Sequence, residues 1–447
     1  MSPPQSSATP CDGQGDCIRP LESASCPTPR TDKPITIGSG IKVQQETDIA
    51  GVEDLSLSRY HHGLGFYNAG PSIEPPPASL GRAWRLSFDK RLHPLTGISA
   101  KMALLHPNGD IQYFGANGHE LFNFGRPSGQ LTPVGDGHRY RSADNTEDYD
   151  ASGRLISITR SNGHTLTLTY STVATPTTIA PTPGLLIQVA DAYGRSLNFI
   201  YDGSGRIVQA TGPNGAVVTY AYDGPSASGQ GSNNLTSVTY PDGTSRTYWY
   251  NEPGHTGNYS LHTLTGITDE SGIRYVTYTY DAQGRAIDEI YPAVGSNTNR
   301  YQLTFGSNST TVTDPLGTSR TYTYQTIQGV LRHTGVSQPG GSGCGPASTA
   351  QSHDNNGNVT SRTDFNGNVT TYVYDTTRNL ETKRVEASGQ PEARTISTQW
   401  HSTWRQPTKI AEPKKLTTWT VNGDNNVYCA PQSATVPSLD GGTRPIG

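Results

Sequence analysis

The chain has 447 residues and a formal net charge of −4, from 33 basic and 37 acidic side chains. This balance excludes a strongly basic nucleic-acid-binding protein, and no apolar run is long enough to form a membrane helix. Gly (50), Pro (32) and Tyr (24) are abundant, whereas charged residues make up only 16% of the chain. Because this composition favours short strands joined by tight turns, we predict an all-β protein.

Residues 1–34 form a leader that is rich in Ser, Pro and Cys. The leader lacks the apolar core of a secretory signal peptide, and we expect it to be disordered. No C-x-x-C pair is present, so the cysteines do not predict a zinc or thioredoxin-like site. A disulfide within the leader and a set of reduced thiols are both compatible with the spacing. The five cysteines are Cys11, Cys17, Cys26, Cys344 and Cys429.

Residues 35–143 show the alternation of a β domain. Ile35 and Ile37 alternate with polar residues, and so do Trp84 and Leu86, which is the period of a half-buried strand. The Pro-Asn-Gly-Asp sequence at 107–110 predicts a hairpin turn between two further apolar segments. We therefore predict an antiparallel β meander over residues 35 to about 140.

Residues 144–389 repeat a Tyr-Asp pair followed three residues later by Gly and often by Arg. In such a turn the Asp carboxylate can accept hydrogen bonds from later backbone N–H groups, and Gly tolerates the positive φ that returns the chain. Each unit is then one hairpin, and neighbouring hairpins must pair into one long sheet to bury a face. We expect rows of Tyr to stack across strands, and each Arg to pair with the Asp of a neighbouring repeat. The repeat residues are Tyr149, Asp150, Gly153, Arg154, Tyr201, Asp202, Gly205, Arg206, Tyr222, Asp223, Tyr280, Asp281, Gly284, Arg285, Tyr374 and Asp375.

These Tyr-Asp-x-x-Gly-Arg units resemble the YD repeats of Rhs proteins, the bacterial polymorphic-toxin shells related to animal teneurins. Segments 35–48, 55–62 and 80–85 are similar to the domain that precedes such repeats. The resemblance implies a β-sheet that spirals into a hollow shell around a C-terminal toxin. It also implies toxin cargo and secretion machinery as partners, and a secreted or cell-surface location.

The sequence departs from the family pattern near its end. Asp314-Pro315 begins like the motif that closes family shells, but it runs into an ordinary repeat strand. Residues 390–447 are expected to be divergent repeats, and this chain ends before any core-closing motif or toxin. We interpret the chain as the N-terminal part of an Rhs-type shell, or as a truncated member.

No catalytic, cofactor-binding or metal-binding motif stands out, so we predict a scaffold without enzymatic activity. His61 and His62 are adjacent, and on a strand they would point to opposite faces. The turn at 354–358 faintly resembles a calcium loop but lacks the distal Glu. An enzyme that cleaves polysaccharide would need paired carboxylates in a groove, and the sequence offers only turn aspartates.

The alternative function belongs to a different class. A secreted or cell-surface carbohydrate-binding or adhesion module would use aromatic rings that stack on sugar rings, and cell-surface glycans would be its partners. Packing between neighbouring strands is the other explanation for the same rings. The candidate residues are Trp249, Trp400, Trp404 and Trp419.

Overall fold

The structure is a computed structural model. It describes residues 30–445 except 32–33, 52–54, 64–78, 96–100, 121–128, 143–144, 161, 225–232, 258–261, 293–298, 328–329, 403–405, 422–426, 429–434 and 438–442. The leader up to residue 29, Trp404 and all cysteines but Cys344 therefore lie outside the described residues. Every regular element in the described part is a β-strand, as predicted. No helix in that part is long and apolar enough to cross a membrane.

The N-terminal region forms two small antiparallel sheets in which each strand pairs with the next. The strand predicted around Trp84 and the hairpin at 107–110 are both present, but Arg85 is buried like its neighbours, so this strand is not half-buried. The strand predicted around Ile35 and Ile37 was wrong, because residues 37–39 form a turn. The two sheets separate at the turn after β3, where the Asp89 carboxylate accepts the N–H of Leu86 at 2.8 Å and ends the ladder. The strands are β1 (Val43–Ile49), β2 (Leu57–His62) and β3 (Trp84–Leu86), then β4 (Arg91–Pro94), β5 (Met102–Leu105) and β6 (Ile111–Phe114).

Strands β7 to β25 form one antiparallel sheet of 19 strands, in which each strand pairs with the next in sequence. The sheet begins before the first Tyr-Asp unit, because β7 and β8 already pair into it through β9. Its strands are β7 (Gln130–Val134), β8 (Gly137–Arg141), β9 (Asn145–Tyr149), β10 (Leu155–Arg160), β11 (Thr165–Tyr170), β12 (Leu186–Asp191), β13 (Ser196–Tyr201), β14 (Ile207–Thr211), β15 (Val217–Tyr222), β16 (Leu235–Thr239), β17 (Ser245–Tyr250), β18 (Leu264–Thr268), β19 (Arg274–Tyr280), β20 (Ala286–Ile290), β21 (Arg300–Phe305), β22 (Ser309–Thr313), β23 (Ser319–Ile327), β24 (Val330–Gln338) and β25 (Ala347–Ser348).

A second antiparallel sheet, of nine strands, follows after residue 349. Its first strand, β26, lies against β24 of the large sheet, and this contact is called the seam below. The strands are β26 (Ala350–His353), β27 (Val359–Thr363), β28 (Val369–Asp375), β29 (Leu380–Glu386), β30 (Arg394–Trp400), β31 (Pro407–Glu412), β32 (Lys415–Thr418), β35 (Thr435–Pro437) and β36 (Thr443–Pro445). A separate pair is formed by β33 (Thr420–Val421) and β34 (Val427–Tyr428).

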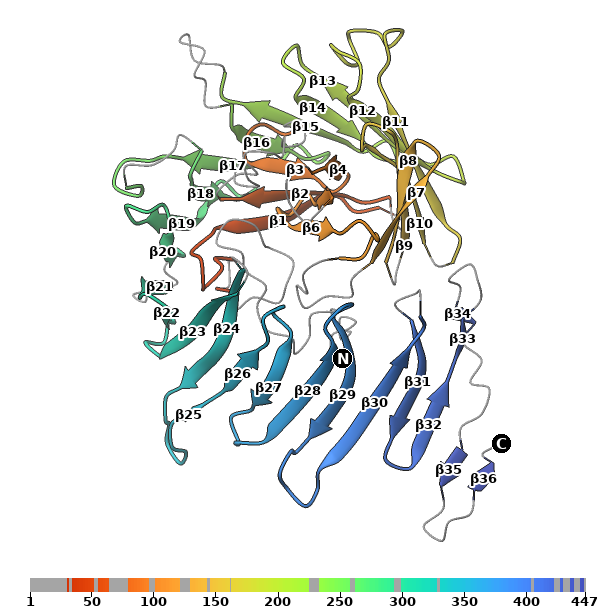
Figure 1. Cartoon of the computed structure of the whole chain (residues 1–447). Helices are drawn as coiled ribbons and strands as arrows, with labels where there is room; N and C mark the ends of the chain where they lie inside the picture. The colour runs from red at the N-terminus through yellow and green to blue at the C-terminus, as the bar shows by residue number, and fades with distance from the viewer. Residues whose placement is uncertain are drawn as a thin grey trace.

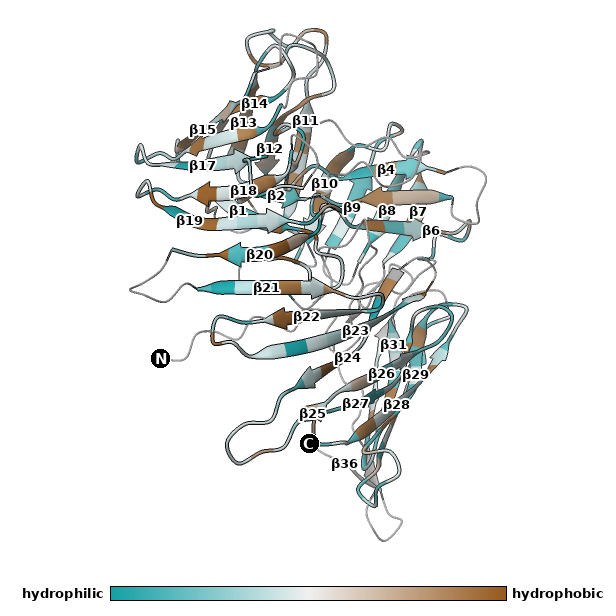
Figure 2. Cartoon of the chain, turned by 90° about the vertical axis from the view of Figure 1, so that its left-hand side faces the viewer, coloured by the Kyte–Doolittle hydropathy of each residue, from teal (hydrophilic) through white to brown (hydrophobic). Residues whose placement is uncertain are grey.

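The repeat strands alternate between buried and exposed side chains, and this alternation gives the large sheet one apolar face. On β15, Val218 and Tyr220 are buried while Val217 and Thr219 are exposed. Figure 2 shows the same alternation as brown and teal residues along the strands. The buried side chains of the large sheet form one cluster that includes Trp84 of the N-terminal region. Figure 1 shows how the large sheet curves around β1 to β3.

Candidate functional site

Each repeat motif forms a tight turn that an Asp carboxylate holds together. The N–H of Asp202 donates to the carbonyl of Arg206 (2.8 Å), and the N–H of Gly205 donates to the carbonyl of Asp202 (3.0 Å). Oδ1 of Asp202 accepts the N–H groups of Ser204 (2.9 Å) and Arg206 (3.0 Å). Gly205 has a φ of +76°, which a residue with a Cβ adopts at a cost of about 1 kcal/mol. The predicted turn geometry is confirmed.

The carboxylates of these turns are engaged in holding the backbone. Partial burial opposes ionisation of Asp202, but hydrogen bonds from Arg206 and Ser204 outweigh it and lower the pKa of this carboxyl. An ionised, fully hydrogen-bonded carboxylate is a poor general acid at neutral pH. Turns of this geometry begin at Asp150, Asp191, Asp202 and Asp281, and, with Asn in place of Arg, at Asp354 and Asp364.

The Arg that follows the turn Gly pairs with the Asp of its own turn. Arg154 contacts Asp150 at 2.7 Å, and the corresponding distances at the 202 and 281 turns are 2.6 and 2.7 Å. The prediction that each Arg reaches the Asp of a neighbouring repeat was therefore wrong. The reason is that the turn reverses the chain, so that residue i+4 comes to lie opposite residue i. Each guanidinium also covers an aromatic ring of a nearby strand, as Arg206 does over Tyr222 at 4.6 Å.

The tyrosine hydroxyls bind backbone carbonyls across the sheet. The hydroxyl of Tyr201 donates to the carbonyl of Leu186 at 2.7 Å, and that of Tyr222 donates to the carbonyl of Ile207 at 2.6 Å. Tyr280 makes the same contact to the preceding strand, through the carbonyl of Leu264. The accepting carbonyls of Leu186, Ile207 and Leu264 each lie where the pairing register of the preceding strand shifts. The Tyr rows therefore stabilise the sheet by hydrogen bonds as well as by ring packing.

The remaining predicted repeat residues also have structural contacts. The hydroxyl of Tyr149, which is buried, donates to Glu147 at 2.5 Å. The Asp223 carboxylate accepts the Asn234 side-chain amide at 3.1 Å, and Asp375 accepts a backbone N–H of its own turn at 3.0 Å. Since these residues lie on successive turns and strands, the structure spreads the motif along the sheet rather than gathering it into one site.

A buried polar cluster joins the N-terminal sheet to the large sheet. Arg59 on β2 is fully buried, and its Nε lies 2.9 Å from Oδ1 of Asp48 on β1. It also contacts Glu46 at 2.5 Å. From the large sheet, the hydroxyl of Tyr220 donates to Asp48 at 2.8 Å, and Tyr248 hydrogen-bonds Glu46. The N-terminal strands are thus held on the concave face by charged hydrogen bonds as well as by apolar contact.

Burial acts on both carboxyls of this cluster, and it raises the pKa of Asp48 although the charge of Arg59 opposes the rise. Burial raises the pKa of Glu46, but the charges of Arg59 and Arg246 more than offset it and lower the pKa overall. Removing one member of such a cluster leaves an uncompensated buried charge, at a cost of about 3–5 kcal/mol. The sequence analysis did not predict this cluster. Arg59 and Tyr248 are 189 positions apart, and no repeat or alternation in the sequence indicates that they meet.

The two adjacent histidines are buried in the N-terminal sheet. The His61 ring packs edge-on against Trp84, with 5.2 Å between ring centroids. Burial, together with the nearby charges of Lys42 and His62, lowers the pKa of His61 well below its ordinary value, so this ring is neutral at physiological pH. Across the described residues, no group of three or more His, Cys, Asp or Glu side chains could hold a metal ion.

The three described tryptophans among the sugar-binding candidates are divided between two sheets. Trp249 on β17 is 44% exposed, and its indole N–H donates to Thr268 at 2.9 Å. The indole N–H of Trp400 on β30 donates instead to the carbonyl of Glu381 at 2.8 Å. Trp419 follows β32 and is half-buried. Trp249 therefore lies in the large sheet, whereas Trp400 and Trp419 lie on either side of β31 in the second sheet.

The fold and its turns define an antiparallel β-repeat protein. The family model described as RHS Repeat matches residues 201–224 and 353–391. These segments contain the 202 turn in the large sheet and the 354 and 364 turns in the second sheet. These two segments of the chain match the RHS repeat, in agreement with the resemblance inferred from the Tyr-Asp units.

Solved structures with a similar chain path are large toxin complexes. One is the Photorhabdus luminescens Tc holotoxin pore with mutated TccC3, at 11% identity and a TM-score of 0.44, covering 88% of this chain and 24% of that chain. Another is TcdB2-TccC3 without the hypervariable C-terminal region, at 12% identity and a TM-score of 0.43, covering 88% and 23%. The present chain spans about a quarter of the length of these structures. No curated protein sequence matches the chain.

Proposed function

We propose that this chain forms part of the wall of a larger β shell, which encloses a C-terminal toxin and helps to deliver it in competition between bacteria. The observation that supports the proposal is the curved 19-strand sheet, whose concave face packs against a separate part of the chain. The cluster around Arg59 seals this contact with buried charges. A wall with an enclosed inner face is the basic requirement of a container for another polypeptide.

In this proposal the repeats act as a scaffold without enzymatic activity. The Asp, Arg and Tyr side chains of the motif maintain turns and strand pairing, as their hydrogen bonds show at the 202 turn. The partners are the toxin cargo and the secretion machinery, and the protein acts outside the producing cell or at its surface.

The test uses the complete gene product. The coding sequence beyond codon 447 is determined, and the complete protein is treated with protease in the folded state and after unfolding by urea. We expect the reading frame to continue through further Tyr-Asp repeats to a toxin domain that resists protease only while the shell is folded. A reading frame without further repeats would contradict the proposal. So would a C-terminal domain that is cleaved equally fast in both states.

A further inference from the structure

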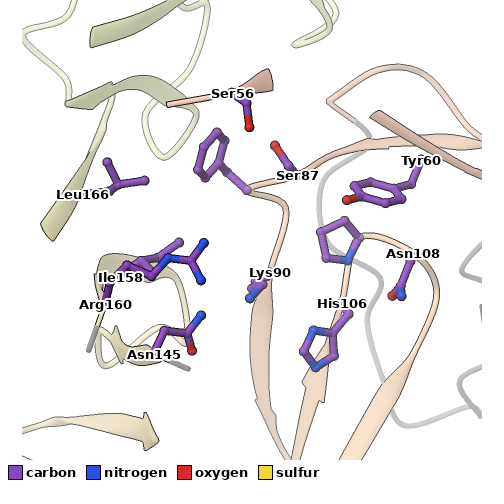
Figure 3. A pocket seen from close by; sticks show the side chains of 12 residues that line it. Ser56, Tyr60, Ser87, Lys90, His106, Asn108, Asn145, Ile158, Arg160 and Leu166 are labelled. Carbon is purple, nitrogen blue, oxygen red and sulfur yellow. The ribbon is translucent and has the colours of Figure 1, made fainter. Parts of the chain in front are cut away.

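Among the described residues, the N-terminal region covers the concave face of the large sheet, whereas the second sheet extends beyond this cover. Where the region meets the large sheet it leaves a cavity of about 290 Å³ (Figure 3). Phe88 and Lys90 of the N-terminal region line this cavity together with Ile158 and Leu166 of the large sheet. Strands β26 to β32 lie away from β1 to β6 in both views of the molecule (Figures 1 and 2).

The concave face continues from the large sheet into the second sheet. Tyr324 on β23 lies under the N-terminal region, since a Cβ on Gly38 would come within 2.8 Å of its ring. The ring of Tyr324 contacts that of His333, with 5.8 Å between the centroids. The charge of Arg362 on β27 acts on the pKa of both His333 and Tyr372, which is on β28. Arg362 and Tyr372 therefore lie on the side of the second sheet that continues the concave face.

Charged side chains replace apolar ones on this part of the face. On the large sheet, Tyr220 of β15 is paired with Val238 of β16, and both are buried. Tyr372 takes the position of Tyr220 in the second sheet, because each precedes a Tyr-Asp pair by two residues. The partner of Tyr372 on β29 is Arg384. Since paired residues of an antiparallel sheet share one face, an arginine stands where the large sheet has a buried valine.

Six charged side chains of alternating sign follow one another across β29 to β32 on this face. Glu386 contacts Arg384 at 3.3 Å and Arg394 at 3.4 Å, and Arg394 also contacts Glu412 at 3.3 Å. The first and last pairs of the series are longer, at 3.6 Å each. The six side chains are between 19 and 57% exposed. They are called the paired-charge face and are, in order, Glu381, Arg384, Glu386, Arg394, Glu412 and Lys415.

The paired-charge face is poorly suited to hold a partner tightly. An apolar surface binds an unfolded polypeptide by taking apolar side chains out of water. Covering the paired-charge face would instead remove water from charges that already have partners, so desolvation opposes binding. Three of the six side chains are basic and three are acidic, so the face has no net charge with which to attract a uniformly charged partner. The face therefore fits a partner that moves along it without adhering.

We propose that the paired-charge face is a low-adhesion surface for an unfolded polypeptide enclosed by the shell. This inference rests on the proposed function, and it assigns to the enclosed polypeptide the part of the concave face that lies beyond the N-terminal region. The paired charges keep water between the wall and the polypeptide, so that apolar side chains of the polypeptide are not held. On the large sheet the same face binds the N-terminal strands tightly, through buried side chains such as Tyr220.

The experiment measures binding of a model unfolded polypeptide to the whole chain. The probe is fluorescein-labelled α-lactalbumin that has been reduced and carboxymethylated, and binding is followed by fluorescence anisotropy. The double variant Arg384→Leu/Glu386→Leu makes part of the face apolar without changing the net charge, and it should bind the probe at least about tenfold more tightly than the wild type. The matched control is Arg384→Gln/Glu386→Gln, which removes the same charges but leaves the face polar. It should bind the probe as the wild type does.

Two results would overturn the proposal: binding of the probe by the wild type as tightly as by the leucine variant, or a tenfold difference between the glutamine variant and the wild type. The second result would mean that the charges themselves hold the polypeptide. If the leucine variant fails to fold, judged by its circular dichroism spectrum, Thr398→Leu takes its place, because Thr398 lies on the same face two residues after Ile396, the partner of Arg384. Equal binding by Thr398→Leu and the wild type would then overturn the proposal. Any of these failures leaves the proposed shell function standing, because the protease experiment tests that function on the complete gene product.

Discussion

Lowering the pH should weaken the seam between the two sheets, and the protonation of His333 should account for much of the loss. His333 lies on β24 against the rings of Tyr322 and Tyr324, with ring centroids 6.0 and 5.8 Å away. Burial and the charge of Arg362 lower the pKa of His333 from 6.5 to about 4, although a hydrogen bond with the Gly335 backbone opposes the change.

The direction of the pH effect follows from this lowered pKa. Between about pH 6.5 and 4 the unfolded chain binds a proton at His333 and the folded chain does not, so acid favours unfolding in that window. The contribution of His333 to the free energy of unfolding is fully present above pH 6.5, the ordinary pKa of histidine. It decreases as the pH falls, and the decrease levels off below about pH 4. The difference between the two pKa values corresponds to about 3 kcal/mol.

A second histidine adds to the loss from the other side of the seam. His353 lies on β26, and its pKa is also lowered to about 4, by burial and by the charges of Arg332 and His333, with Asp354 acting in the opposite direction. Because His353 is more exposed than His333, we expect its contribution to be the smaller one.

The assay compares urea denaturation of the wild type and of His333→Phe at several values between about pH 7 and pH 4. Phe keeps the ring packing but cannot be protonated, so the free energy of unfolding of the variant should fall by about 3 kcal/mol less across this range. The matched control is His401→Phe, because His401 follows β30, outside the seam. Equal pH slopes for the wild type and His333→Phe would refute the reasoning.

Three further substitutions test the turns, the tyrosines and the buried cluster. Gly153→Ala should cost several kcal/mol in a thermal unfolding assay, because its Cβ would lie 1.9 Å from the carbonyl oxygen of Leu92, whereas Gly205→Ala has open space and should cost only about 1 kcal/mol; similar losses would contradict this. Tyr222→Phe removes one hydrogen bond and should lower the free energy of unfolding by about 1 kcal/mol, measured by urea denaturation. Arg59→Met should cost about 3–5 kcal/mol and make the N-terminal strands accessible to hydrogen exchange, and unchanged exchange there would argue against the cluster's role.

The strands and turns were predictable because their signals are local. The hairpin turn at Asp202 is encoded within five residues, and its Asp, Gly and flanking alternation act through the backbone of the same segment. The Arg206 partner was mispredicted for a related reason: the motif fixes which residues are present, but only the three-dimensional turn shows that Arg206 faces its own Asp. The cluster around Arg59 was beyond prediction, because its members meet only after the N-terminal strands have docked on the large sheet.

Docking itself poses a problem that apolar burial cannot solve alone. A repetitive sheet presents nearly the same inner face every two strands, so a shift of the N-terminal strands by one hairpin would bury a similar apolar area. The polar cluster opposes such a shift in the direction of β13. In the observed position Asp48 accepts the hydroxyl of Tyr220, which lies two residues before Tyr222 on β15. The corresponding residue on β13, two before Tyr201, is Phe199. After a shift towards β13, Asp48 would therefore face Phe199. Phe has no hydroxyl, and an unsatisfied buried carboxylate oxygen costs about 1–3 kcal/mol or more. The carboxylate of Asp48 therefore disfavours docking of the N-terminal strands one hairpin nearer to β13.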